Sequence, residues 1–199
     1  MTSKQAFRGG LTALAGILLC TVSISVAAAQ QSKLRIVQTN SAGDNVHIID
    51  AATNKVVGEV KGIEAPHGVA TAPDGSKIYF SEQATNTVTV VDGKTLQVIK
   101  RIPLSGNPNL IDLTPDGRSL YVAQQGSEDI AIVDLQTRET TVLSCACRPT
   151  VFSPLRGDSV FRLNGLSNGP ISVLDASSSS PRTLFIPVDP NVLAEHREQ

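Results

Sequence analysis

Short runs in which apolar and polar residues alternate recur along the chain, and each run ends at an aspartate. Thr-Val-Thr-Val-Val precedes Asp92, Ile-Ala-Ile-Val precedes Asp134, and comparable runs precede Asp50 and Asp175. Alternation with a period of two is typical of a β-strand with one buried face. The four aspartates are separated by 42, 42 and 41 residues, so the chain is predicted to be a tandem repeat of one β unit. We expect each aspartate to cap a turn, because equivalent positions of successive units lie far apart.

Two further markers recur with the same period. Pro-Asp-Gly begins at Pro73 and again at Pro115, 42 residues later, and each is followed by an apolar strand that contains a tyrosine. A proline also begins the short segments at Pro66, Pro108 and Pro149. Proline followed by Asp-Gly favours a tight hairpin turn. Each unit is thus predicted to contain four short strands, which is typical of a β-propeller blade.

The predicted fold class is all-β, a β-propeller of about four four-stranded blades within residues 30–199. The blades are expected at residues 34–62, 66–104, 108–146 and 149–188, followed by a tail at residues 189–199. Ile36 lies 42 residues before Ile78, which belongs to the second strand of the next unit. The first unit is therefore expected to begin without an innermost strand.

Three arrangements of the ends of the ring are left open by this pattern. Pro190–Leu193 resembles the innermost-strand segment Pro108–Ile111, so a C-terminal strand could complete the first blade and close the ring. Alternatively, Asp189 could cap a helical tail. The chain could also be a shortened relative of a seven-bladed propeller, with an open ring that pairs with a second copy as a homodimer.

Residues 1–29 are predicted to be a signal peptide that is cleaved before Gln30. Two basic residues precede an apolar run at Leu11–Ile24, and alanines at positions 27–29 offer the small residues needed for cleavage. The alternative is an uncleaved transmembrane anchor, because the apolar stretch approaches the roughly 20 residues that span a bilayer. Polar residues inside the run favour cleavage, so the protein is expected to be exported to the periplasm or the extracellular space.

The composition narrows the classes of partner. The chain has 17 Lys and Arg against 18 Asp and Glu, and its aromatic residues are five Phe and two Tyr, with no Trp. Nucleic-acid binders need basic residues for phosphates and aromatic residues for base stacking. Removal of the predicted leader leaves 15 basic against 18 acidic residues, a net charge of −3. Nucleic acid and, after cleavage, the membrane are therefore not expected as partners.

The repeats resemble those of a known group of propellers. Ile-Tyr-Phe-Ser at 78–81 and Leu-Tyr-Val-Ala at 120–123, each followed by a strand that ends at Asp92 or Asp134, are similar to the YVTN repeats of the YncE-like β-propeller family. The likeness is weaker in the fourth unit, where Pro154–Asp158 replaces the Pro-Asp-Gly turn with one extra residue. The resemblance implies an exported bacterial propeller of about seven blades, often without an assigned reaction. The lack of Trp argues against quinone-cofactor propeller dehydrogenases, and the sequence requires no cofactor.

One face of the predicted propeller collects the loops in which a binding site is expected. His67 and Asn109 occupy equivalent positions at the mouth of the axial channel, and Glu82, Gln83 and Gln124 are expected to rim it. The alternative is that these are solvated loop residues that cap strand ends. The pattern predicts ligand binding and assigns no residue to catalysis or to a metal.

Cys145 and Cys147 are the second candidate feature. An even pair of cysteines in an exported protein suggests a disulfide, although one intervening residue makes a small ring. Two thiolates could otherwise hold a soft metal such as Cu(I) together with His67. A third alternative is that both residues only fill space between blades. His47 and His196, in a strand and in the tail, are not expected to complete a metal site.

These patterns favour an exported, non-enzymatic propeller that binds a partner protein or a small ligand on the face with His67, Asn109 and the Cys145 loop. The alternative is a propeller enzyme or an oxidoreductase-associated subunit, active in lactonase-like hydrolysis or as a redox accessory. In that alternative His67 and Glu82 would act as acid and base at the channel mouth.

Overall fold

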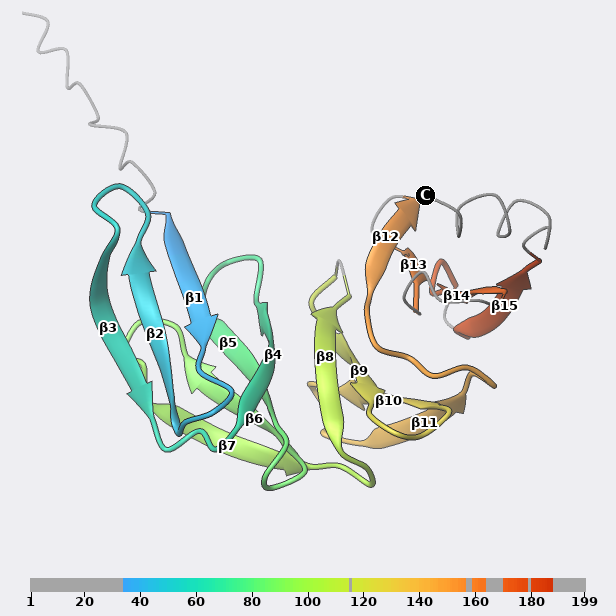
Figure 1. The fold of residues 1–199 in the computed structure, drawn as a ribbon, viewed down its shortest axis with the longest axis horizontal. Helices are drawn as coiled ribbons and strands as arrows, with labels where there is room; N and C mark the ends of the chain where they lie inside the picture. Colours follow the sequence, from blue (N-terminus) through green and yellow to red (C-terminus); the bar gives the residue numbers. More distant parts are fainter. Residues whose placement is uncertain (1–33, 115, 157–158, 164–169, 179, 188–199) are drawn as a thin grey trace, which may run out of the picture. The chain divides into compact units, whose positions relative to one another are not determined.

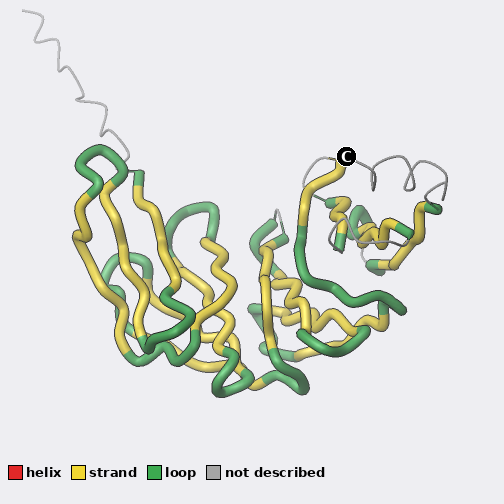
Figure 2. The backbone as a smooth tube through the Cα atoms, viewed as in Figure 1, coloured by secondary structure: helices red, strands yellow, loops and turns green. Residues whose placement is uncertain are grey.

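The computed structural model describes residues 34–187, except for residues 115, 157–158, 164–169 and 179. In this part of the chain the backbone consists of strands, turns and loops, without a helix (Figure 2). Accordingly, none of the described segments is a helix long and apolar enough to cross a membrane. The predicted leader at residues 1–29 and the tail at residues 189–199, including Pro190–Leu193 and His196, lie outside the described residues.

The described residues form fifteen strands in four antiparallel sheets, which follow one another in chain order (Figure 1). Sheet 1 consists of β1 (Arg35–Thr39), β2 (Asn45–Asp50) and β3 (Lys55–Lys61). Sheet 2 consists of β4 (Pro66–Thr71), β5 (Lys77–Glu82), β6 (Thr87–Asp92) and β7 (Val98–Pro103). Sheet 3 consists of β8 (Pro108–Leu113), β9 (Ser119–Gln124), β10 (Asp129–Asp134) and β11 (Thr140–Ser144). Sheet 4 consists of β12 (Ser153–Arg156), β13 (Val160–Arg162), β14 (Ile171–Asp175) and β15 (Arg182–Ile186).

The predicted capping role of the periodic aspartates is confirmed. Asp92 Oδ1 accepts hydrogen bonds from the backbone N–H groups two and three residues later, at 2.9 and 2.7 Å. Asp50 and Asp134 accept the same pair of bonds, and Asp175 accepts the bond from the residue two positions later. Each carboxylate therefore closes the turn of its own sheet.

The Pro-Asp-Gly segments form tight turns between the first two strands of sheets 2 and 3. Gly75 has a φ of +69° and donates its N–H to the carbonyl oxygen of Ala72 at 2.8 Å. Gly117 has the same φ and makes the same bond to Thr114. A positive φ is strained for residues with a Cβ atom, so glycine suits this position. The recurrence of glycine after one period reflects a recurring backbone conformation.

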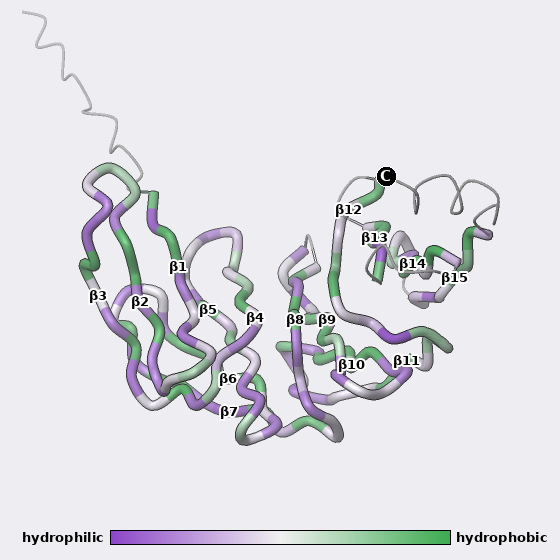
Figure 3. The backbone as a smooth tube through the Cα atoms, in the orientation of Figure 1, coloured by the Kyte–Doolittle hydropathy of each residue, from purple (hydrophilic) through white to green (hydrophobic). Residues whose placement is uncertain are grey.

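Successive sheets pack face to face through buried apolar side chains. The core between sheets 1 and 2 contains Val46, Ile48, Val60, Ile63, Ile78, Phe80 and Val91. The core between sheets 2 and 3 includes Tyr79, Val88, Val90, Ile102, Leu120, Val122 and Val133. Hydrophobic residues alternate with hydrophilic ones along many strands (Figure 3), and each inner sheet packs apolar residues against both of its neighbours. Antiparallel sheets stacked in chain order are propeller blades, which confirms the predicted fold class.

Sheet 1 begins at the second strand of the repeat, as expected. Arg35 of β1 pairs with Asp50 in the register in which Lys77 of β5 pairs with Asp92. Within the described residues sheet 1 has three strands, and the counterpart of β4 and β8 is not among them. The edge formed by β1 is therefore the edge at which an innermost strand would add.

Sheet 4 departs from the repeat at its first strand. β4 and β8 begin at their marker prolines, whereas β12 begins at Ser153, four residues after the marker Pro149. The register of β12 against β13 shifts between Pro154 and Arg156. The extra residue noted in this unit is thus accommodated by an irregular strand pairing.

Candidate functional site

The two residues expected at the channel mouth lie on neighbouring innermost strands, His67 on β4 and Asn109 on β8. The strands approach closely here, because a Cβ atom at Gly68 would lie 2.7 Å from the carbonyl oxygen of Asn109. Ser81 bridges them, since its Oγ accepts the N–H of Gly68 at 2.7 Å and donates to the Asn109 carbonyl oxygen. Backbone atoms therefore fill the space between β4 and β8 at this level, and a side chain at position 68 would not fit.

Three of the expected site residues carry buried polar atoms that have no hydrogen-bond partner among the described residues. These atoms are His67 Nδ1, Asn109 Oδ1 and Gln124 Nε2. The Asn109 side chain belongs to a residue that is 9% exposed, and Gln124 is 3% exposed. A buried polar atom that lacks a partner costs about 1–3 kcal/mol of stability. The unpartnered atoms on β4, β8 and β9 thus lower stability at the end of these strands where the site is predicted.

Glu82 is buried and engaged by hydrogen bonds. Its Oε1 accepts from Thr89 Oγ1 and, at 3.3 Å, from Arg101 Nε, while its Oε2 accepts from Thr85 Oγ1 at 3.0 Å. Arg101 also donates through Nη2 to the carbonyl oxygen of Gly62 at 2.6 Å. Both carboxylate oxygens are therefore occupied, and the hydrogen bond from Arg101 to Gly62 ties sheet 2 to the connection that leaves sheet 1.

Gln124 stands one period after Glu82 but in different surroundings. Ala131 occupies the place that Thr89 has in sheet 2, which removes one hydroxyl donor from the site. Gln124 packs against Gly106, where a Cβ atom would lie 1.8 Å from Gln124 Oε1. In this structure Gln124 is a buried packing residue between sheet 3 and the loop that leads into it.

Gln83 is paired with a residue that the sequence pattern did not single out. Its Nε2 donates to Gln125 Oε1 at 3.1 Å, and its carbonyl oxygen accepts from Asn107 Nδ2 at 3.0 Å. The N–H of Gln125 donates to the carbonyl oxygen of Asn107 at 2.7 Å. Gln83 and Gln125 are 42 residues apart, so the repeat period was the available signal for this pair.

Cys145 and Cys147 form a disulfide with a Cα–Cα distance of 5.0 Å. Both residues are buried in the core between sheets 3 and 4, which also contains Tyr121, Phe161 and Leu163. In this form neither sulfur is a free thiolate that could bind a soft metal together with His67. Among the described residues no group of three or more His, Cys, Asp or Glu side chains is arranged to hold a metal ion.

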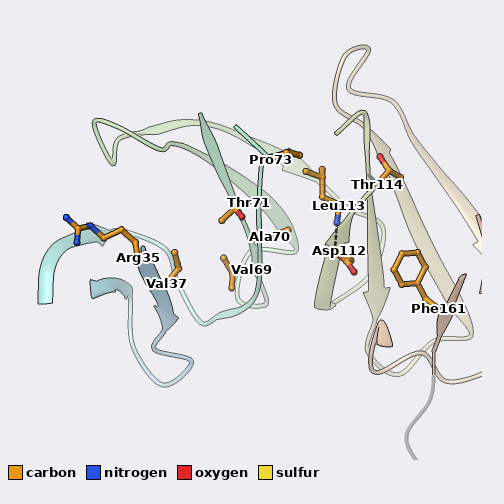
Figure 4. A pocket seen from close by; sticks show the side chains of 10 residues that line it. All are labelled: Arg35, Val37, Val69, Ala70, Thr71, Pro73, Asp112, Leu113, Thr114 and Phe161. Carbon is orange, nitrogen blue, oxygen red and sulfur yellow. Dashed lines mark hydrogen bonds between the residues drawn. The ribbon is translucent and has the colours of Figure 1, made fainter. Parts of the chain in front are cut away.

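A hollow of about 540 Å³ lies further along the innermost strands (Figure 4). Its lining comes from all four sheets and consists of Arg35, Val37, Val69, Ala70, Thr71, Pro73, Asp112, Leu113, Thr114 and Phe161. Val69 and Thr71 follow His67 along β4, beyond the point at which the register of β4 against β5 shifts between Pro66 and Val69. The sequence pattern predicts a site at the start of these strands and does not single out the residues that line the hollow.

The two charged residues at this hollow have bonding partners. Arg35 forms an ion pair with Asp50, and this hydrogen bond is the main reason that the pKa of Asp50 lies below its usual range. Asp112 Oδ1 accepts the N–H of Leu113 at 2.8 Å (Figure 4). The remaining lining is mostly apolar, with the hydroxyl-bearing residues Thr71 and Thr114. Such a concave surface suits a largely apolar ligand that forms few polar contacts.

The stacked sheets and the hollow beside their innermost strands define the protein as a β-propeller. The family model "Lactonase, 7-bladed beta-propeller" matches residues 22–155. This match covers more than half of the chain, and the chain therefore belongs to the lactonase family of seven-bladed propellers. No curated protein matches the chain.

Solved structures share the fold over part of their length. Hydrazine synthase of Kuenenia stuttgartiensis is 28% identical with a TM-score of 0.63, over 76% of this chain and 46% of that one. The dihydro-heme d1 dehydrogenase NirN is 20% identical with a TM-score of 0.57, over 76% and 35%. Virginiamycin B lyase from Staphylococcus aureus is 16% identical with a TM-score of 0.61, over 78% and 53%. The chain thus spans about half or less of the length of each of these proteins.

Proposed function

We propose that the chain is an exported, non-enzymatic member of the lactonase propeller family that binds a small ligand beside its innermost strands. The observation that carries the proposal is the hollow of about 540 Å³, to which all four sheets contribute. A concave, mainly apolar surface with a few polar groups is the usual form of a small-molecule site. The ligand site is therefore placed further along β4 and β8 than His67 and Asn109.

The lining favours a compact and largely apolar ligand. Val37, Val69, Leu113 and Phe161 offer apolar surface, and Thr71 offers an exposed hydroxyl. The Arg35 guanidinium is engaged by Asp50, so it favours an uncharged carbonyl or ester oxygen over a competing carboxylate. A lactone, which is a cyclic ester, combines these properties, and the name of the matched family points to the same class.

Binding without turnover is favoured by the state of the candidate acid and base. Glu82, the carboxylate paired with His67 in the hydrolytic alternative, is engaged by Arg101 and two threonine hydroxyls. A general base must reach the proton that it abstracts. Lactonase-like hydrolysis remains the second candidate function, because the family is named for it.

The proposal also includes export of the protein and a position close to the YncE-like propellers within the lactonase family. The Cys145–Cys147 disulfide favours an oxidising compartment, which agrees with a cleaved leader at residues 1–29. The Ile-Tyr-Phe-Ser and Leu-Tyr-Val-Ala repeats at 78–81 and 120–123 favour a position near the YVTN, YncE-like propellers within the family.

Dihydrocoumarin, an aromatic lactone, tests binding and hydrolysis with one probe. Saturation-transfer NMR reports binding, and the absorbance of the opened ring reports hydrolysis. We expect binding without hydrolysis, and we expect Thr71→Phe to abolish binding by filling the hollow. Gln97→Phe places the same side chain on an exposed turn of sheet 2 and is expected to leave binding unchanged.

Three results would count against the proposal. Hydrolysis above the buffer rate that Thr71→Phe removes would establish the enzymatic alternative. Binding that Thr71→Phe and Gln97→Phe reduce equally would place the ligand elsewhere. A lack of any saturation transfer would reject the lactone class.

A further inference from the structure

Another hollow, of about 470 Å³, lies between sheets 2 and 3 at the end of these sheets that is remote from His67. Lys77 begins β5 at this end, whereas Glu82 ends β5 beside Pro66, the neighbour of His67. The residues that line the hollow are Lys77, Tyr79, Gly117, Arg118, Leu135 and Gln136. The lining therefore contains two cations and no carboxylate.

Two further cations lie beside this hollow. Lys100 of β7 pairs with Val90, which belongs to the core between sheets 2 and 3, so Lys100 is on the face of sheet 2 that meets sheet 3. Arg138 lies in the turn between β10 and β11 of sheet 3. Burial lowers the pKa of Lys100, and the positive charges of Arg138 and Lys77 lower it further, because all three side chains are close together. We call Lys77, Lys100, Arg118 and Arg138 the cationic seam.

The cations of the seam form no ion pair within the described residues. The ion pairs in this part of the chain belong to Arg35, Lys61, Arg101 and Arg182. Asp74, Asp116 and Asp134 also lie near the seam, but the Oδ1 atom of each accepts backbone N–H groups of its own turn. The donors of the seam side chains are therefore not used by these carboxylates.

The contact between sheets 3 and 4 has a hollow of about 560 Å³ at the equivalent place, with different chemistry. Three positions that carry cations in the first contact carry hydroxyl groups in the second. These are Ser119 for Lys77, Thr141 for Lys100 and Ser159 for Arg118, matched by period, strand register and turn hydrogen bonds. The charged residues of this second lining are Arg118, Asp116 and Asp134. An excess of cations is thus a property of one contact and not of the repeat.

We propose that the cationic seam binds a small oxyanion that carries two or more negative charges. Like charges held close together repel one another, and a multivalent anion removes this repulsion when it binds. Arginine offers a planar fork of N–H donors to an oxyanion, and lysine adds a compact point charge. A hollow of about 470 Å³ has the size of a small-molecule site.

This site is separate from the apolar hollow in which a lactone is proposed to bind. The two linings have no residue in common, so either site can exist without the other.

Isothermal titration calorimetry of the full chain with inorganic pyrophosphate tests the proposal. The ionic strength is held constant with sodium chloride, because added salt screens charges. We expect binding by the wild type, and Lys100→Met should weaken it about tenfold or more, because it removes a half-buried cation. Lys94→Met removes the same charge from an exposed turn of sheet 2 and is expected to leave the affinity unchanged.

Arg118→Met is the second variant, because Arg118 is an exposed turn residue whose side chain can be replaced without disturbing a strand. It should weaken pyrophosphate binding in the same way as Lys100→Met. The absence of any binding by the wild type would overturn the proposal. An equal loss of affinity in Lys94→Met, Lys100→Met and Arg118→Met would also overturn it, since the effect would then follow net charge.

Citrate, titrated under the same conditions, distinguishes two sources of multiple negative charge. Tighter binding of pyrophosphate assigns the seam to phosphate-bearing molecules, and tighter binding of citrate assigns it to polycarboxylates. In either case Lys100→Met must weaken the binding of the preferred anion. If it does not, the anion binds elsewhere and the proposal is wrong.

Discussion

Sheets 1 and 2 pack together in the same way as sheets 2 and 3, because both contacts are built from the same repeat. The two contacts differ at one buried polar position, which is Glu82 in the first and Gln124 in the second. In the first contact Glu82 is bonded to Thr89 and Arg101. In the second, Gln124 stands at the equivalent position, and its buried Nε2 has no partner within the part of the chain that the structure describes. The change of Thr89 to Ala131 after one period accompanies this difference.

The difference shows that equivalent positions in successive repeats keep the same backbone conformation and burial, whereas their side-chain hydrogen bonds change. Apolar positions such as Ile78 and Leu120 are buried in both contacts, because any apolar side chain of suitable size fills the space. A buried polar group instead needs a specific donor or acceptor, and this partner must change together with it. Four predictions test the comparison.

The apolar cores are expected to give the largest effect. Phe80→Ala between sheets 1 and 2 should lower the free energy of unfolding by about 3–5 kcal/mol, and Leu120→Ala between sheets 2 and 3 by about 2–5 kcal/mol. Urea unfolding followed by circular dichroism measures both. Val142→Ala, at an exposed residue, should change stability by less than about 0.5 kcal/mol. A loss below about 1 kcal/mol for Phe80→Ala would show that the first contact does not hold the sheets together.

The ion pair of the first contact is expected to rank second. Arg101→Met leaves the buried Glu82 carboxylate without its cation and should cost about 1.5–3 kcal/mol, near the lower value because Arg101 is 42% exposed. Adding Glu82→Gln should recover most of this loss, because the amide carries no buried charge. If urea unfolding finds the two substitutions additive, the pair is not coupled.

The equivalent position of the second contact should respond in the opposite direction. Gln124→Leu removes an unsatisfied buried amide and should leave stability unchanged or raise it by about 1 kcal/mol. Glu82→Leu should lower stability, since Arg101 and two hydroxyls lose their acceptor. The midpoint of thermal unfolding is measured for Gln124→Leu and Glu82→Leu. If both substitutions shift the midpoint in the same direction, the two positions contribute to stability in the same way and the prediction is wrong.

The turn aspartates are expected to give the smallest effect, visible as a pH dependence. The pKa of Asp175 is lowered to about 2 from its ordinary 3.8, mainly by hydrogen bonds from Ser177 and then from Arg182. A lowered pKa means that the ionised carboxylate stabilises the folded state above its ordinary pKa, and this contribution is lost as pH falls from about 4 to about 2. Thermal melts at pH 5 and about pH 2 should therefore differ less for Asp175→Asn than for the wild type.

Asp44→Asn is the control for this titration, because it removes a charge from the loop between β1 and β2 and leaves the turn of sheet 4 intact. An equal flattening of the pH dependence by both variants would assign the effect to net charge and not to the Asp175 turn.

The repeat, the strands and their turns could be predicted from the sequence alone, because the interactions that specify them are local. The bond from Asp92 reaches only two and three residues ahead, and Gly75 bonds back to Ala72 within one turn. Alternation with a period of two then assigns each strand a buried face. The family match at residues 22–155 agrees with the fold that these local signals predict.

The tertiary structure decided how the polar residues of the candidate site are used. Glu82 meets Arg101 from a strand 19 residues away, and Gln83 meets Gln125 across 42 residues. The hollow collects residues from Arg35 to Phe161, whose common location depends on how all four sheets stack. Local sequence specifies the blade because its bonds span a few residues, whereas hydrogen bonds and hollows between blades depend on side chains that only packing brings together.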